Sequence, residues 1–181
     1  MPINLKVNTF ALDIWDDERS KCSFYTVRYA QNNSNETDKF LEKYGNKREY
    51  TEDIKKLVQL LLVQIGDKYG ADLAFFDRQE NLATALPPHK NKVTRNIKEI
   101  LLDNQLRLYC LRLSDQVVVL FNGGVKLPNT TAHQDSPELY TKFREAQSFA
   151  KKILRELDDE MIIAADRVIT DFTGSTDIEI K

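Results

Sequence analysis

The spacing of apolar residues along the chain predicts both helices and strands. Aromatic and β-branched residues over 21–30 predict a strand. Apolar residues recur at spacings of three and four in a segment that begins near Thr51 and again over 136–160, so each is expected to form a helix with one buried face. Ser136 and Pro137 suit the start of the second helix, and a shorter helix is expected over 36–45.

Two nearly continuous apolar runs, 106–113 and 117–125, flank the polar connection Ser114-Asp115-Gln116. A short polar connection between such runs predicts an antiparallel hairpin, and the continuous apolar character predicts that its strands are central in a sheet. Another strand pair is predicted over 73–86, around a polar turn.

The rest of the chain is less strongly patterned. Residues 92–104 have weak helical periodicity, and 161–170 is expected to add a last strand before a loose tail. This order predicts a single α+β domain over 1–181, with an N-terminal arm at 1–20 and a C-terminal extension at 161–181. The expected architecture is an antiparallel sheet packed against N-terminal helices and a C-terminal helix.

The formal net charge of the chain is −2, from 26 basic and 28 acidic side chains. A dedicated nucleic-acid binder usually has a basic excess, so the overall charge argues mildly against that class. The segment from Arg78 to Lys126 differs, because its eight basic and four acidic side chains give it a net charge of +4. A cationic sheet region on an acidic body can still attract a polyanion.

The two cysteines, Cys22 and Cys110, lie in predicted strands without metal-ligand neighbours. We expect two reduced, buried thiols in a cytoplasmic protein, and a disulfide between them stays open. The N-terminal residues show no signal-peptide pattern, and the longest apolar run is far shorter than the roughly 20 residues that span a bilayer. No membrane association, metal or cofactor is expected, since no nucleotide or metal-ligand motif is visible.

The central hairpin carries polar residues that its apolar surroundings do not explain. Strand alternation places Arg107 and Tyr109 on one face and Arg112 on the other, while Lys126 follows the second strand. Guanidinium and ammonium groups can stabilise phosphate, and a tyrosine can stack on a base or donate a proton. If this face handles phosphate, Arg107 should lie on an open side of the sheet. In the alternative, Arg107 pairs with a buried acid and Tyr109 packs in the core.

Cleavage of RNA at a 2′-hydroxyl also requires a general base. Glu80, His89 and His133 are the candidates, and nothing in the sequence selects one of them. Gly123 and Gly124 either permit a positive φ at the strand end or allow the backbone to approach a phosphate closely.

The stretches "LRLYCLRL" and "VVVLFNGGVK", followed by "SPELYTKFREAQSFAKKI", resemble the RelE/ParE toxin superfamily, and within it the HigB-like branch. "FFDRQENLATAL" is similar to the earlier strand pair of that family, and 90–105 looks like an insertion. The resemblance covers residues 21–160.

The resemblance implies a RelE-like fold and the toxin of a type II toxin–antitoxin pair. Such a toxin is a metal-independent endoribonuclease that cleaves messenger RNA on the ribosome and is neutralised by an antitoxin, typically a DNA-binding protein. The family motif falls on Arg107, Tyr109 and Lys126 as catalytic residues, with RNA-binding roles for Arg78, Arg112, Lys90 and Lys92. The alternative is a non-catalytic module of the same fold that holds the antitoxin or another partner protein.

Overall fold

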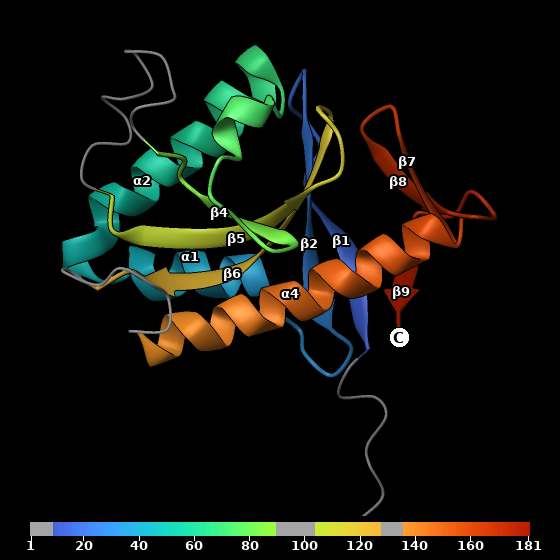
Figure 1. Ribbon diagram of the computed structural model, residues 1–181. Coiled ribbons are helices and arrows are strands. Elements are labelled where there is room, and N and C mark those ends of the chain that lie inside the picture. Colours follow the sequence, from blue (N-terminus) through green and yellow to red (C-terminus); the bar gives the residue numbers. More distant parts are fainter. Residues whose placement is uncertain (1–8, 90–103, 128–135) are drawn as a thin grey trace, which may run out of the picture.

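The computed structural model describes residues 9–89, 104–127 and 136–181, and Figure 1 shows how their elements are arranged. In chain order the elements are β1 (Phe10–Asp16), β2 (Ser23–Tyr29), α1 (Glu36–Gly45), η2 (Arg48–Tyr50), α2 (Thr51–Gln59), η3 (Leu60–Tyr69), η4 (Leu73–Phe75), β3 (Gln79–Glu80), β4 (Ala83–Leu86), β5 (Leu106–Arg112), β6 (Val117–Val125), α4 (Pro137–Asp158), β7 (Ile162–Ala165), β8 (Val168–Asp171) and β9 (Ile178–Ile180). The predicted α+β class is confirmed.

Seven of the strands form one mixed sheet in the order β3-β4-β5-β6-β2-β1-β9, and β7 pairs with β8 separately. The predicted central hairpin is confirmed, since β5 and β6 are antiparallel neighbours inside the sheet. The prediction of a purely antiparallel sheet is wrong, because β2 and β6 pair in parallel. These two strands are far apart in the sequence, so no turn between them could have shown their relative direction.

Apolar cores cover both faces of the sheet. Helix α4 crosses one face, while α1, α2 and the π-helical segment η3 cover the other (Figure 1). The predicted helix that begins at Thr51 buries Leu57, Leu61 and Ile65, as its periodicity indicated, and it ends at Gly70, where φ is +73°. No helix of the described segments is long and apolar enough to cross a membrane.

Both ends of the described chain belong to the sheet, which the sequence did not indicate. Within the predicted N-terminal arm, β1 pairs with β2, and Phe10 is buried. The prediction of a loose C-terminal tail is wrong, because β9 pairs with β1 and buries Ile178 and Ile180 against the core on the α4 side. The three residues of β9 are too few to show a strand pattern in the sequence. The tail is ordered because it pairs with the neighbouring strand β1.

Two other predictions were right only in part. The predicted pair over 73–86 is a short hairpin of β3 and β4, and its expected first strand is instead the 3-10 turn η4. The single strand expected over 161–170 is the hairpin of β7 and β8, which turns at Asp166 and Arg167 with positive φ at both residues. Of the predicted helix over 92–104, all but Asn104 lies outside the described residues.

The burial of β9 predicts that the C-terminal tail stabilises the domain. Ile180 is 1% exposed, so Ile180→Ala should lower the free energy of unfolding by about 2–5 kcal/mol, as large-to-small core substitutions do. Chemical denaturation of the purified variant measures this. Glu179→Ala, at the exposed neighbouring position, is the control and should stay within about 0.5 kcal/mol of the unchanged protein. A similar small effect for both variants would show that β9 is not part of the stable sheet.

Candidate functional site

The register of β5 against β6 decides which face each predicted residue occupies. Tyr109 belongs to the core under α4, and Leu108 and Cys110 belong to the core under α1 and α2. Arg107 lies on the α4 face with Tyr109, and Arg112 lies on the opposite face, as strand alternation predicted. No single face therefore holds all three polar side chains.

Tyr109 is a core residue in this structure. It is 1% exposed, and its ring makes an edge contact with the ring of Phe143 on α4, with the ring centroids 5.8 Å apart. A buried ring in this position packs the helix onto the sheet. The structure thus gives Tyr109 the packing role that the sequence left open, and RNA could reach the ring only if α4 moved away.

Arg112 is likewise held by the fold, on the other side of the sheet. Its Nε donates a hydrogen bond to the carbonyl oxygen of Ala71, with a nitrogen–oxygen distance of 2.6 Å. Ala71 follows η3, so this contact ties the end of the helical layer to β5. Arg112 is not brought together with Arg107 or Lys126.

Arg78, Arg107 and Lys126 do lie on one face. The amide of Ala85 donates to Arg78 O, which continues the β3–β4 ladder, and Ala85 pairs with Tyr109, so Arg78 and Tyr109 share the α4 face. Arg107 pairs with Gly124 on β6. The amide of Lys126 donates to Gln105 O at 2.9 Å, so the ladder extends by one pair and alternation places Lys126 on the face of Arg107.

The Arg78 side chain lies against the residues that follow β4. Its Nε donates to Pro87 O at 2.7 Å. Leu86 pairs with Leu108, so Pro87 is level with Arg107 on the neighbouring strand. The two arginines therefore converge on the same end of the strand pair β4–β5. Arg107 itself is half-buried, and its Nη1 donates to Asn104 O and Leu106 O at 3.1 and 2.8 Å.

His89 is bonded to Asp77 and Arg78 at this strand end. Asp77 Oδ1 accepts from the His89 amide at 3.0 Å, and Oδ2 is 3.1 Å from the ring Nδ1. Arg78 Nη1 is 3.2 Å from the ring Nε2. A guanidinium can only donate, so Nε2 is the acceptor and Nδ1 carries the proton that Asp77 accepts. The Asp77 side chain is 8% exposed and that of His89 51%, so a buried carboxylate orients an accessible imidazole.

The remaining predicted residues fall outside the parts of the chain that the structure describes. Lys90, Lys92 and His133 lie outside the described residues, as does the side chain of Glu80. Of the three candidate bases, His89 is the one whose surroundings the structure shows. Within the described part of the chain, no three His, Cys, Asp or Glu side chains come together as a metal site. Cys22 and Cys110 are both buried and free, and burial raises the pKa of the Cys22 thiol to about 12.

Gly123 and Gly124 allow close packing of the strands. The expectation that they adopt a positive φ is wrong. Neither has a positive φ. Two residues of β6, Phe121 and Asn122, stand opposite the single residue Tyr109 at a β-bulge. Just beyond the bulge a Cβ on Gly123 would lie 1.8 Å from Arg107 O, so only glycine allows the strands to approach this closely. The other expectation, a close approach of this backbone to phosphate, stays a prediction.

The sequence analysis did not single out Glu145, a half-buried carboxylate on α4. Its Oε2 is buried, lies 3.7 Å from Lys142 Nζ, and has no hydrogen-bond donor among the described residues. Burial, and secondarily the charge of Glu36, raises the pKa of Glu145 above its ordinary value, although Lys142 opposes the shift. Glu145 lies four residues before the buried Phe149, so its place at the border of the apolar stripe was the available signal.

Comparisons of the chain with protein-family models, with curated proteins and with solved structures find no match.

The raised pKa of Glu145 predicts a pH-dependent stability. Its carboxyl holds a proton more tightly in the folded chain than in the unfolded chain, where the ordinary value is 4.5. The unfolding free energy should therefore fall as the pH rises above about 4.5 and through the raised pKa. Glu145→Gln removes the ionised form and should stabilise the protein at pH 7.5 by on the order of 1 kcal/mol, and by almost nothing at pH 4.

Urea denaturation at both pH values measures this difference. Glu42→Gln, on the exposed side of α1, is the matched control and should change stability equally little at both. An effect of Glu145→Gln that is the same at pH 4 and pH 7.5 would contradict the assignment.

Proposed function

We propose that the protein is the toxin of a type II toxin–antitoxin pair, a metal-independent endoribonuclease that cleaves messenger RNA on the ribosome. The observation that carries the proposal is the Asp77–His89–Arg78 contact at the end of β4, level with Arg107 on β5. It supplies an oriented base beside groups that can bind phosphate. The proposed substrate class rests on the resemblance of the hairpin to the RelE/ParE superfamily. The proposal that the fold is RelE-like rests on the same resemblance.

His89 is the proposed general base. The Asp77 carboxylate keeps the proton on Nδ1, so the Nε2 lone pair is available to accept the proton of a 2′-hydroxyl. Arg78 occupies that lone pair in the free protein. A bound ribose would replace Arg78 as the donor to Nε2, and the guanidinium would be released toward the adjacent phosphate.

The three cations on the α4 face are proposed to stabilise the reacting phosphate. The 2′-oxygen attacks phosphorus, the bond from phosphorus to the 5′-oxygen breaks, and a 2′,3′-cyclic phosphate remains. Arg78 and Arg107 offer paired donors to the phosphorane oxygens as negative charge accumulates there. The Lys126 ammonium donates the proton that the leaving 5′-oxygen takes up.

The proposed partners are the ribosome with its message and an antitoxin protein, expected to bind DNA, in the cytoplasm. Arg78, Arg107 and Lys126 favour the approach of a polyanion to this end of the sheet, although the chain as a whole is slightly acidic.

Cleavage of message in a reconstituted translation system tests the proposal. Mapping of message ends should reveal new 5′ ends within translated regions. His89→Gln keeps a hydrogen-bonding side chain but removes the base, and it should slow cleavage about 100- to 10,000-fold. Arg107→Ala should slow cleavage strongly and destabilise the fold by about 1–3 kcal/mol, since it removes the hydrogen bonds to Asn104 O and Leu106 O.

Arg48→Ala is the matched control, because Arg48 is exposed on η2 and takes no part in the proposed site. It should cleave like the unchanged protein. Intact message at stoichiometric protein would refute the endonuclease. A large fall in the melting temperature of Arg107→Ala would identify Arg107 as a structural residue.

A non-catalytic binding module is the second candidate. The burial of Tyr109 favours it, because one residue of the family's catalytic motif is packed in the core. The two candidates differ in cells: expression of the toxin alone should arrest growth, and the protein encoded beside it should relieve the arrest. The module should bind its neighbour without any arrest.

A further inference from the structure

The β7–β8 hairpin is a two-stranded sheet separate from the main sheet, held at its turn by Arg167 Nη1, which donates to Arg19 O, and packed on the core by one of its two sides. Ile162 and Ile169 are buried in the core under α4, and the Ile169 amide donates to the Tyr25 hydroxyl at 2.9 Å. The other side of the hairpin carries Ile163, which is 49% exposed, and Val168, which is 42% exposed. An isolated two-stranded sheet with an exposed apolar side is an unusual feature for a protein surface.

One edge of this hairpin is occupied and the other is not. On β8, the outward amides of Ile169 and Asp171 donate to the Tyr25 hydroxyl and to Ser175 O. Their partners across the ladder, Ala164 and Ile162, must then direct their own N–H and C=O groups away from β8. Among the described strands, β7 pairs with β8 alone, so these groups form a free edge.

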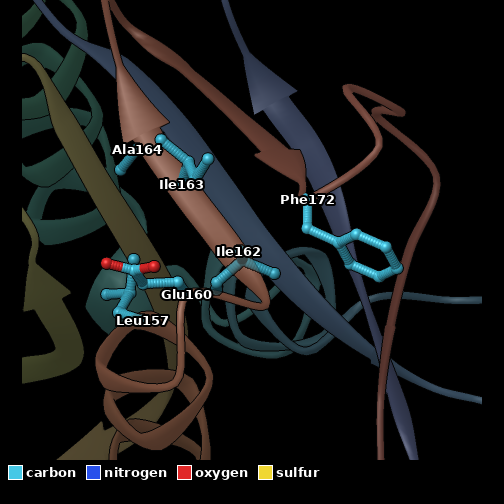
Figure 2. Close-up of a pocket in the computed structure, with 6 residues that line it drawn as sticks. All are labelled: Leu157, Glu160, Ile162, Ile163, Ala164 and Phe172. Atoms are coloured by element: carbon cyan, nitrogen blue, oxygen red, sulfur yellow. The ribbon is translucent and has the colours of Figure 1, made fainter.

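A pocket of about 610 Å³ lies along β7. Figure 2 shows the side chains that line it: Leu157 and Glu160 at the end of α4, Ile162, Ile163 and Ala164 on β7, and Phe172 after β8. The Phe172 side chain is 64% exposed. No residue of β8 lines the pocket, which places this largely apolar hollow beside the unpaired strand.

The segment of the chain that forms the pocket is strongly acidic. Residues 156–181 hold eight acidic and two basic side chains, a net charge of −6. Glu160 is part of the lining, and Asp158 and Asp159 precede it at the end of α4. A basic partner is therefore attracted to this end of the molecule, and a second copy of the same acidic hairpin is repelled.

We infer that β7 is a docking edge for an extended segment of a partner protein in which apolar side chains alternate with lysine or arginine. The segment adds as a strand to β7, where the outward groups of Ile162 and Ala164 supply main-chain hydrogen bonds. Its apolar side chains enter the pocket beside Phe172, and its basic side chains meet the acidic rim. The inference does not depend on RNA cleavage by the distant strand end at Arg107.

Peptide arrays test this docking edge with the full-length protein. One array carries nonapeptides with Val, Ile, Leu or Phe at alternate positions and Lys or Arg between them, and a matched array carries Asp or Glu instead. Fluorescence anisotropy then gives the affinity of the tightest sequences. The basic peptides should bind at least about tenfold more tightly than the acidic ones, and less tightly as salt is added.

Two controls separate strand addition from charge attraction alone. N-methylation of the alternate peptide amides that face β7 should abolish binding, because it removes the main-chain donors. Phe172→Ala should weaken binding, whereas Val63→Ala, at an exposed apolar residue of η3, should not. Failure of every basic peptide to bind, equal binding of the methylated peptides, or a dimer in sedimentation that Phe172→Ala dissociates would overturn the inference.

Discussion

The close approach of β6 to β5 at Gly123 is the constraint on which the centre of the molecule depends. Any side chain there would collide with Arg107 O, since even a Cβ would lie 1.8 Å from it. The bulge at Phe121 and Asn122 sits beside this contact and shifts the pairing by one residue. As a result, Gly124 stands opposite Arg107, and the ladder that reaches Lys126 brings the two cations to one face.

Coverage of the sheet on both faces restricts where chemistry can occur. Tyr109 is sealed under α4, and Arg112 is bound to Ala71 on the other side, so the middle of β5 offers no surface to a substrate. The strand ends differ, because the chain leaves the sheet there and polar side chains can reach water. That is where Arg78 and His89 meet, beside the start of β5. The middle of β5 is therefore not the open sheet face that was expected, and the candidate site lies at the end of the sheet.

Charge is unevenly distributed along the sequence, which the net charge of −2 conceals. The segment that holds the strand-end site carries +4, and the C-terminal segment with the β7–β8 hairpin carries −6. Exposed charges are screened over roughly 8–10 Å at physiological salt, so we expect the proposed RNA site and the proposed docking edge to act almost independently of each other.

The sequence by itself determined the elements whose patterns are long and local. The periodicity of 136–160 predicted α4, the two apolar runs around Ser114 predicted the central hairpin, and alternation separated Arg107 from Arg112. Only the tertiary structure decided what depends on residues distant in the chain. Three contacts join segments whose meeting leaves no local pattern: the parallel pairing of β2 with β6, the pairing of β9 with β1, and the contact of His89 with Asp77. For the same reason, the sequence did not decide whether Tyr109 is buried. The sequence pattern of a strand is the same whether a helix or water covers its aromatic ring.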